Sequence, residues 1–292
     1  MSAGTMDNCS RWLDDPKFKL IKDDLRNKDA VSRAVGGASV VFHEAARPSV
    51  PLSVKDPLTT LEINVTGTGL LLEECRRHDA EKFVVASSSS VYGDTPILPR
   101  VESMRPSPTS SYAASKLAQE SIVMSYYRTY GLNTTALRYF KVYGPRQRSG
   151  SYAGVASAFI SSALRLLPLT MEGDGCQTRD FTFVDDVVDA NIRVAETKNT
   201  AGEIHNVGSG SQVSMFGLAD TIRRTTGSQS PIVHAPERTG DVRHSLAGIE
   251  KIRDQTGYTP RTTIEEGIRK TIAWVTQRAD EPEPTETGED CA

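Results

Sequence analysis

KFVVASSSSVYGD at residues 82–94, followed by SSYAASK at residues 110–116, is the stretch around which this chain is organised. The short apolar run at 83–86, bounded by small residues, predicts a buried parallel strand. The serines follow at its carboxyl end, where open α/β sheets place their ligands. The second segment opens a predicted helix, and Tyr112 and Lys116 share one face of it because they are four residues apart.

These residue types at this spacing predict an acid–base pair. A phenol has a reference pKa of about 10, so it is a poor base at neutral pH. A nearby lysine ammonium favours the phenolate and lowers that pKa, so we expect Lys116 to lower the pKa of Tyr112. A serine hydroxyl at the strand end could hydrogen-bond the same substrate oxygen, or the tyrosine. The pair would then act on a carbinol or carbonyl group, whereas the alternative is a surface helix with a chance spacing.

The serine-rich strand end and the Tyr-x-x-x-Lys pair resemble the extended short-chain dehydrogenase/reductase superfamily. Within it, the chain resembles the NAD-dependent epimerase/dehydratase family, and most of all its UDP-glucose 4-epimerases, from about Trp12 to Val275. The resemblance implies NAD-dependent epimerisation at C4 of a UDP-sugar, such as UDP-glucose or UDP-N-acetylglucosamine, through a transient 4-keto sugar. Tyr112 would remove the 4-hydroxyl proton and Lys116 would bind the nicotinamide ribose. Ser88 would hydrogen-bond the sugar oxygen, with Ser87 and Ser89 as alternatives.

Further motifs imply the remaining cofactor contacts. Asp24 and Leu25 match an Asp–aliphatic pair that contacts the adenine of NAD in the family. Ala45 and Ala46 match small residues that let the backbone approach the pyrophosphate. Asn64 matches an asparagine that would steady the loop beneath the nicotinamide end, and an asparagine inside a helix is otherwise mildly unfavourable.

The implied substrate contacts lie later in the chain. YFKVYGPRQ at residues 139–147 is similar to a family motif, but Lys141 stands where the family has an asparagine that touches the substrate diphosphate. A lysine could still meet a phosphate as a point charge. Arg179 and Arg238 match two arginines that grip the diphosphate. Asp241 matches a residue that contacts the uridine ribose.

We expect an α/β fold, namely a Rossmann-like doubly wound parallel sheet that lacks its first strands, with a smaller C-terminal α/β substrate domain. Residues 1–150 would form the NAD-binding domain, residues 151–278 mainly the substrate domain, with 180–207 returning to the first, and 279–292 a disordered acidic tail. The predicted strands include residues 18–21, 39–43, 133–138 and 204–207. We expect Asp185 to cap a helix.

One element of the family pattern is missing from the sequence. Dinucleotide-binding domains of this kind use a Gly-x-x-Gly-x-x-Gly turn to hold the pyrophosphate. The glycines at 36–37 and 67–69 lack that spacing and lack a strand before them. A βαβ opening of roughly 30 residues is absent, so we expect the chain to bind NAD poorly and to expose apolar surface on the strand at 39–43.

Two alternatives to the epimerase reading stay open. A nucleotide-sugar dehydratase or decarboxylase would share the fold and the Tyr–Lys pair. The related dehydratases carry Asp-Glu directly after the catalytic Ser/Thr, where this chain has Ser89 and Ser90. The other alternative is a truncated, non-catalytic fragment that binds a UDP-sugar but no cofactor.

Composition bounds the remaining possibilities. The 292 residues are 38% hydrophobic and 24% charged with a net charge of −3, and no basic block suggests a nucleic-acid partner. We find no apolar run of about 18 residues and no signal-peptide core, so we expect no membrane association. The four cysteines are isolated and no metal-ligand spacing occurs, which favours free thiols in a cytoplasmic protein. The family resemblance implies a homodimer through the helices at 57–77 and 111–130, with Tyr126 and Tyr127 at the contact.

Overall fold

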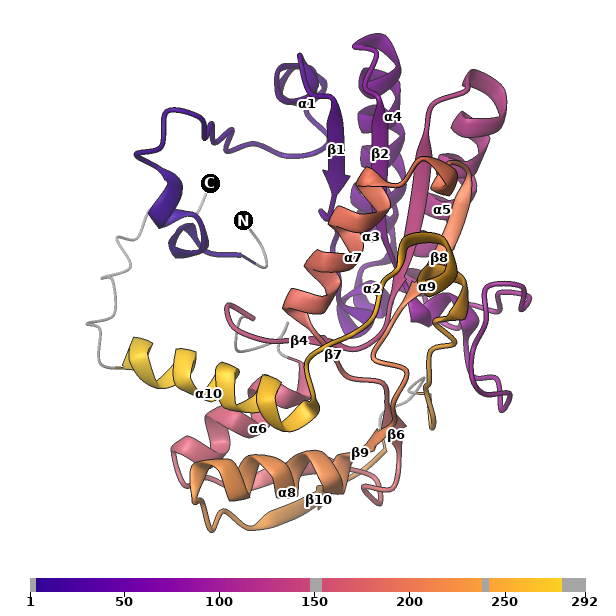
Figure 1. Ribbon diagram of the computed structural model, residues 1–292. Helices are drawn as coiled ribbons and strands as arrows, with labels where there is room; N and C mark the ends of the chain where they lie inside the picture. Colours follow the sequence, from indigo (N-terminus) through magenta and orange to yellow (C-terminus); the bar gives the residue numbers. More distant parts are fainter. Residues whose placement is uncertain (1–3, 148–153, 238–241, 280–292) are drawn as a thin grey trace.

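The computed structural model describes residues 4–147, 154–237 and 242–279 (Figure 1). Its main feature is a four-stranded sheet with the strand order β1-β2-β3-β8 and with every neighbouring pair parallel. The expectation of an α/β fold with an incomplete doubly wound parallel sheet is therefore confirmed. The bounds of these strands are Val40–His43 for β1, Lys82–Ser88 for β2, Thr134–Tyr139 for β3 and Glu203–Val207 for β8.

Helices cover both faces of this sheet, which is why its central strand is buried almost throughout. Successive side chains of β2 point to opposite faces. Phe83 and Val85 enter one hydrophobic cluster, and Val84 enters another. The first cluster is covered by α1 (Lys28–Val35), α4 (Gly67–Arg77) and α5 (Ser111–Tyr130), and the second by α7 (Val184–Glu196) and α9 (Glu250–Thr256).

The sheet ends at β1, and the strand predicted at residues 18–21 is wrong. Residues 17–24 contain no regular structure. A strand requires a neighbour that pairs with its backbone groups, and among the described residues β1 pairs only with β2. Val40 and Phe42 on β1 are 39% and 44% exposed. They form the apolar surface that we expected at this edge.

A smaller cluster lies below the main sheet (Figure 1). It contains a two-stranded parallel sheet of β5 and β10, packed with three helices. Phe159, Leu218 and Ile268 are buried in this cluster. From this arrangement we propose that this part of the chain forms a separate substrate domain. The bounds are Val155–Leu164 for α6, Leu169–Glu172 for β5, Met215–Thr226 for α8, Ile232–Ala235 for β10 and Ile264–Ala279 for α10.

Short elements connect the two parts. Two pairs of two-residue strands, β4 with β7 and β6 with β9, lie between the main sheet and the smaller cluster. The remaining bounds are α2 (Val50–Lys55), α3 (Pro57–Leu61), β4 (Val142–Tyr143), β6 (Thr178–Arg179), β7 (Thr182–Phe183), β9 (Val213–Ser214), the 3-10 turns Met6–Asn8, Ser10–Trp12, Ser89–Tyr92 and Lys198–Thr200, and a π-helical turn at Glu62–Thr66.

The start of α7 differs from the prediction. Helix α7 begins at Val184, and no side chain caps its first turn, so Asp185 does not act as a cap. Asp186 carries the structural role instead. Its carboxylate oxygens accept hydrogen bonds from the backbone N of Arg261 at 3.0 Å and of Thr262 at 3.2 Å. The carboxylate thus ties α7 to the segment that leads into α10. No helix in the described part of the chain is long and apolar enough to cross a membrane.

Candidate active site

A cleft of about 650 Å³ lies at the carboxyl ends of the main strands. This is the edge of a parallel sheet where α/β proteins place their ligands. The structure brings half of the predicted site residues into its lining. They are Ala46, Ser88, Tyr112, Lys116, Lys141 and Arg179.

A tight serine turn ends β2 at the cleft. Ser88 Oγ accepts a hydrogen bond from Ser90 N at 3.2 Å and from Ser90 Oγ at 2.9 Å. The turn closes at Gly93, whose φ is +66°, and a Cβ there would lie 1.9 Å from the carbonyl oxygen of Ser107. Only glycine fits this position. The turn therefore holds the Ser88 hydroxyl at the strand end.

The first turn of α5 brings Tyr112 to the same place. Ser110 Oγ accepts a hydrogen bond from Ala113 N at 3.1 Å, as expected for an N-cap. Ser53 Oγ, on α2, accepts one from Tyr112 N at 3.0 Å. Two of the free N–H groups of the helix end are thus satisfied by side chains. The start of α5 is fixed from both its own turn and a neighbouring helix.

The electrostatics of Tyr112 and Lys116 differ from expectation. Burial raises the pKa of Tyr112, and a hydrogen bond with Ser88 opposes this shift. Lys116 Nζ donates to the carbonyl oxygen of Ala86 at 2.7 Å, and burial lowers the pKa of Lys116 to about 8. The net direction of the Tyr112 pKa is thus opposite to the lowering that we expected from Lys116, whose effect on Tyr112 stays a prediction. The group that favours the phenolate here is the Ser88 hydroxyl.

Asn64 connects the loop after β1 to α5. It is fully buried in the π-helical turn that interrupts the predicted helix at residues 57–77. Its Oδ1 accepts from Arg47 N at 2.8 Å, and its Nδ2 donates to Ser115 Oγ at 2.9 Å. Ser115 Oγ in turn donates to the carbonyl oxygen of Tyr112 at 2.7 Å. The asparagine thus holds both the loop and the start of helix α5.

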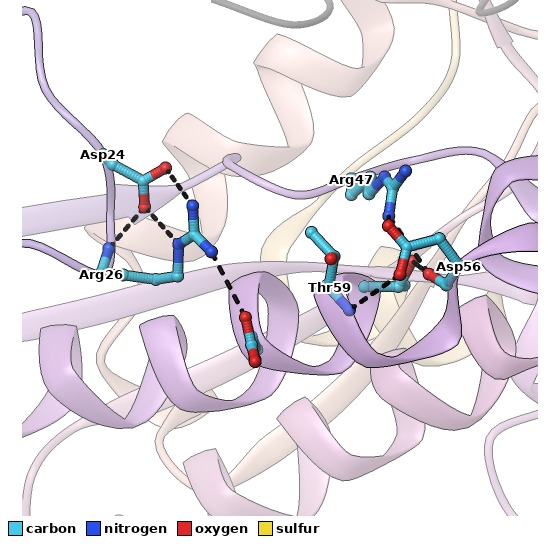
Figure 2. A network of polar contacts seen from close by, with 7 residues as sticks. Asp24, Arg26, Arg47, Asp56 and Thr59 are labelled. Atoms are coloured by element: carbon cyan, nitrogen blue, oxygen red, sulfur yellow. Dashed lines mark hydrogen bonds and ion pairs between the residues drawn. The ribbon is translucent and has the colours of Figure 1, made fainter. Parts of the chain in front are cut away.

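A second contact fixes the same loop, as Figure 2 shows. Arg47 Nη1 lies 2.8 Å from Asp56 Oδ2. The other carboxylate oxygen of Asp56 accepts from Thr59 N at 3.3 Å, which caps α3. One carboxylate therefore anchors both the loop after β1 and the start of a helix.

Four predicted cofactor residues do not line the cleft, namely Asn64, described above, and the three that follow. Asp24 forms an ion pair with Arg26 at 2.9 Å (Figure 2). Leu25 packs on Gly67, where an added Cβ would lie 2.8 Å from Leu25 Cδ2. Ala45 is exposed beside the cleft, whereas its neighbour Ala46 lines it. Their contacts with a cofactor stay predictions.

Positive charge lines the other side of the cleft. Arg179 is 8% exposed, and its Nη1 donates to the carbonyl oxygens of Thr178 at 2.8 Å and Arg243 at 3.1 Å. Arg100, which the sequence reasoning missed, is 1% exposed and donates from Nη2 to the next carbonyl oxygen, that of His244, at 3.1 Å. Two guanidiniums on consecutive carbonyls are suited to an anionic group such as a diphosphate. The predicted residues Arg238 and Asp241 lie outside the described residues.

A second missed group is a carboxylate at the end of β1. Glu44 lines the cleft, and its Oε1 accepts a hydrogen bond from the hydroxyl of Tyr139 at 2.9 Å. Asn191 Nδ2 donates to the same hydroxyl at 2.7 Å. Burial raises the pKa of Glu44, while the Tyr139 hydrogen bond and the charge of Lys116 oppose the shift. The sequence signal that could have identified Glu44 is its position directly after a predicted strand, where parallel sheets place their ligands.

The residues present fit one half of a dinucleotide. The Lys116 ammonium and the Tyr112 hydroxyl are donors suited to a ribose diol, and the small Ala46 leaves room beside them. No glycine-rich turn for the pyrophosphate occurs in the sequence. Within the described ranges, no group of three or more His, Cys, Asp and Glu side chains is placed to hold a metal ion.

Known proteins resemble this chain over most of its length. The model of the family described as "NAD dependent epimerase/dehydratase family" matches residues 2–208. The UDP-glucose 4-epimerase of Mycolicibacterium smegmatis is 36% identical, over 93% of this chain and 87% of the relative.

Two solved structures are similar in fold as well as in sequence. The UDP-N-acetylglucosamine 4-epimerase of Methanobrevibacter ruminantium, in complex with UDP-N-acetylmuramic acid, is 36% identical with a TM-score of 0.88, over 95% of this chain and 89% of that one. The UDP-glucuronic acid 4-epimerase of Bacillus cereus, in complex with UDP-glucuronic acid and NAD, is 31% identical with a TM-score of 0.88, over 94% and 86%.

Proposed function

Because the chain belongs to the NAD-dependent epimerase/dehydratase family, we propose that it inverts C4 of a UDP-sugar through a transient 4-keto sugar. NAD is the cofactor of this family. One observation carries the proposal. Ser88, Tyr112 and Lys116 line the same cleft as the guanidiniums of Arg100 and Arg179, so acid–base groups and anion-binding groups face one ligand space.

The residues divide the chemistry between them. In its phenolate form, which the Ser88 hydroxyl favours, Tyr112 takes the proton of the sugar 4-hydroxyl and later returns it. The Ser88 hydroxyl hydrogen-bonds the same sugar oxygen and favours the anionic form of Tyr112. The Lys116 ammonium holds a ribose of the cofactor. NAD, when bound, supplies the hydride-accepting chemistry at C4. Inversion at C4 would require the keto sugar to turn over within the cleft.

The guanidinium side of the cleft would hold the nucleotide. Arg100 and Arg179 provide donors for the diphosphate, and Lys141 adds a point charge where the family has an asparagine. The relatives act on UDP-glucose, UDP-N-acetylglucosamine and UDP-glucuronic acid, as their names state. We propose UDP-glucose or UDP-N-acetylglucosamine as the substrate.

Other activities within the family fit less well. Dehydration requires a second acid–base pair beside the catalytic serine, and the residues after Ser88 are Ser89 and Ser90. One observation favours a non-catalytic UDP-sugar binder, namely the lack of a glycine-rich turn in the sequence. The free thiols of Cys9, Cys75 and Cys176 support the proposed cytoplasmic location.

The test is a turnover measurement with millimolar NAD added. UDP-glucose and UDP-N-acetylglucosamine are each incubated with the protein, and NMR follows the 4-epimer. Tyr112→Phe should lower turnover at least ~10²-fold, the scale of lost acid–base catalysis. Tyr130→Phe, an exposed tyrosine at the other end of α5, is the control and should leave turnover unchanged. Formation of a dehydrated or decarboxylated product, or full activity in Tyr112→Phe, would contradict the proposal.

A further inference from the structure

A buried carboxylate lies one helical turn beyond Lys116 on the same face of α5. Residues 112, 116 and 120 are spaced four apart, so Glu120 continues the line of Tyr112 and Lys116. Glu120 is 2% exposed. A carboxylate is rarely buried this deeply unless partners satisfy it.

Three strong donors satisfy Glu120, and they come from two strands. Ser87 Oγ, on β2, donates to its Oε1 at 2.5 Å. Arg138, on β3, donates from Nε to Oε1 at 2.9 Å and from Nη2 to Oε2 at 2.7 Å. The Arg138 guanidinium also lies 4.7 Å from the centre of the Tyr92 ring. The carboxylate therefore fixes α5 against the ends of both central strands.

These contacts lie directly beside those of Lys116. Lys116 Nζ donates to Ala86 O, and Glu120 accepts from Ser87, the next residue of β2. Ser88, the residue after that, faces Tyr112. Three consecutive residues of β2 thus meet three residues of one helix face, and a rotation of α5 would disturb all three contacts together.

Charges of both signs surround Lys116. Glu44 after β1 and Glu120 on α5 favour its ammonium form and oppose the effect of burial. His43 on β1 is buried, and the charge of Lys116 helps to hold the pKa of His43 down to about 3, so this ring is neutral at pH 7. Tyr112 on α5 and Tyr139 on β3 have raised pKa values, so both are mainly protonated at pH 7 and add little negative charge beside Lys116. The two carboxylates are therefore the nearby groups that keep Lys116 charged.

We propose that Glu120 is a positioning residue, which fixes α5 on the ends of β2 and β3 and maintains the positive charge of Lys116. The inference rests on the proposed function in one respect, namely that Lys116 binds a ribose of the cofactor. The charge matters for this role because an ammonium group can donate three hydrogen bonds to a ribose diol, whereas a neutral amine can donate two. Glu120 touches no ligand in this scheme and acts through Lys116 and Ser87.

The alternative hypothesis, that Glu120 only forms an ion pair with Arg138, predicts a different result. If Glu120 only paired with Arg138, removing either partner would leave one buried charge and have the same effect on the site. If Glu120 also maintains the charge of Lys116, the two partners are not equivalent. Loss of Glu120 lowers the pKa of Lys116, whereas loss of Arg138 does not.

The experiment measures the titration of Lys116 without substrate. Protein with ¹³C-labelled lysine is titrated by NMR, and the Lys116 signal is assigned by its loss in Lys116→Met. The variants are Glu120→Gln, Arg138→Met and the double variant. The double variant removes both charges and keeps an oxygen for Ser87, so it avoids the unpaired buried charge that could unfold either single variant.

We expect the Lys116 pKa to fall by about one unit in Glu120→Gln and in the double variant, the scale for charges one helical turn apart in a partly buried setting. Arg138→Met should not lower it. An unchanged Lys116 pKa in the double variant, or an equal fall in Arg138→Met, overturns the proposal. Because no turnover is measured, an inactive wild type would refute the proposed function and leave this result standing.

Discussion

Arg100 is the single residue that most changes the description of the site. The residue is 1% exposed, and its Nε is buried without a hydrogen-bond partner among the described residues. Burial lowers its pKa, the charge of Asp94 opposes this shift, and the nearby charge of Arg179 adds to it. Two buried like charges that face one cleft are stabilised when an anion binds between them.

This predicts that both arginines contribute to nucleotide binding. Arg100→Met and Arg179→Met should each weaken UDP binding about 10- to 100-fold, since hydrogen bonds to charged groups contribute about 1.5–3 kcal/mol. Calorimetry with UDP measures the change. Arg105→Met, an exposed arginine outside the cleft lining, is the control and should bind UDP as the wild type does. Unchanged UDP affinity in both cleft variants would exclude this site for the diphosphate.

At the scale of elements, helix α5 carries the proposed acid–base residues Tyr112 and Lys116, and its neighbours hold it in place. The first turn of α5 is fixed by Ser53 on α2 and, through Ser115, by Asn64 in the π-helical turn. Such turns are frequent at functional sites because they redirect a side chain inside a helix. The interruption of the helix predicted at 57–77 is therefore what directs Asn64 toward α5.

Asn64→Ala should affect both stability and turnover. The change leaves Arg47 N and Ser115 Oγ without their partner, which costs about 1–3 kcal/mol of the free energy of unfolding. It also loosens the start of α5, so kcat should fall while the affinity for UDP stays unchanged. Denaturant unfolding and steady-state kinetics measure the two effects. Glu62→Ala in the same turn removes an exposed ion pair and should cost less than about 1 kcal/mol; equal effects of the two variants would argue against this role.

At the scale of the whole molecule, apolar side chains are exposed on both α3 and α5, the helices of the expected dimer contact. Leu58 is 72% exposed, and Leu61 and Tyr127 are each 38% exposed. Tyr126, which we expected at this surface, is partly buried and donates toward Glu73 instead. We propose that this surface forms the homodimer contact, because exposed apolar patches mark interaction sites.

Leu58→Asp should weaken a dimer built on this surface. A buried unpaired carboxylate at the contact is costly, so light scattering at micromolar concentration should show the mass shift from dimer toward monomer. Leu166→Asp is the control, because Leu166 is also 72% exposed but lies on the surface of the smaller cluster. This variant should leave the mass unchanged. A wild-type monomer would refute the dimer.

Two buried histidines predict how the whole molecule responds to acid. Burial lowers the pKa of His43 to about 3 and that of His205 to about 4, from 6.5. Below pH 6.5 the unfolded chain binds protons that the folded chain does not, so stability falls as the pH decreases toward 4. Each histidine should cost about 2 kcal/mol at pH 5 relative to pH 7.

The matched variants separate this effect from other titrations. His43→Gln should reduce the difference in free energy of unfolding between pH 7 and pH 5, as measured by urea unfolding. His234→Gln, an exposed histidine, should leave that difference as in the wild type. The same acid dependence in all three proteins would show that His43 is not the source.

The sequence alone was sufficient for features that depend on near neighbours. Alternating or continuous apolar runs predicted β1, β2, β3 and β8, and a spacing of four placed Tyr112 and Lys116 on one face. The strand predicted at residues 18–21 does not form, because the backbone N–H and C=O groups of a strand must pair with those of a neighbouring strand. Local pattern carries no information about that partner.

Tertiary structure decided which distant residues share the cleft. Arg100 meets the segment of Arg179 and His244 because backbone bridges join Arg100 to Ala247 and Thr178 to His244. Glu120 reaches Arg138 because α5 packs on β3. The sequence predicted that Tyr112 and Lys116 share one helix face, since spacing along one element determines this. It could not predict their charged neighbours or the raised pKa of Tyr112, because burial and long-range contacts arise only when the elements pack.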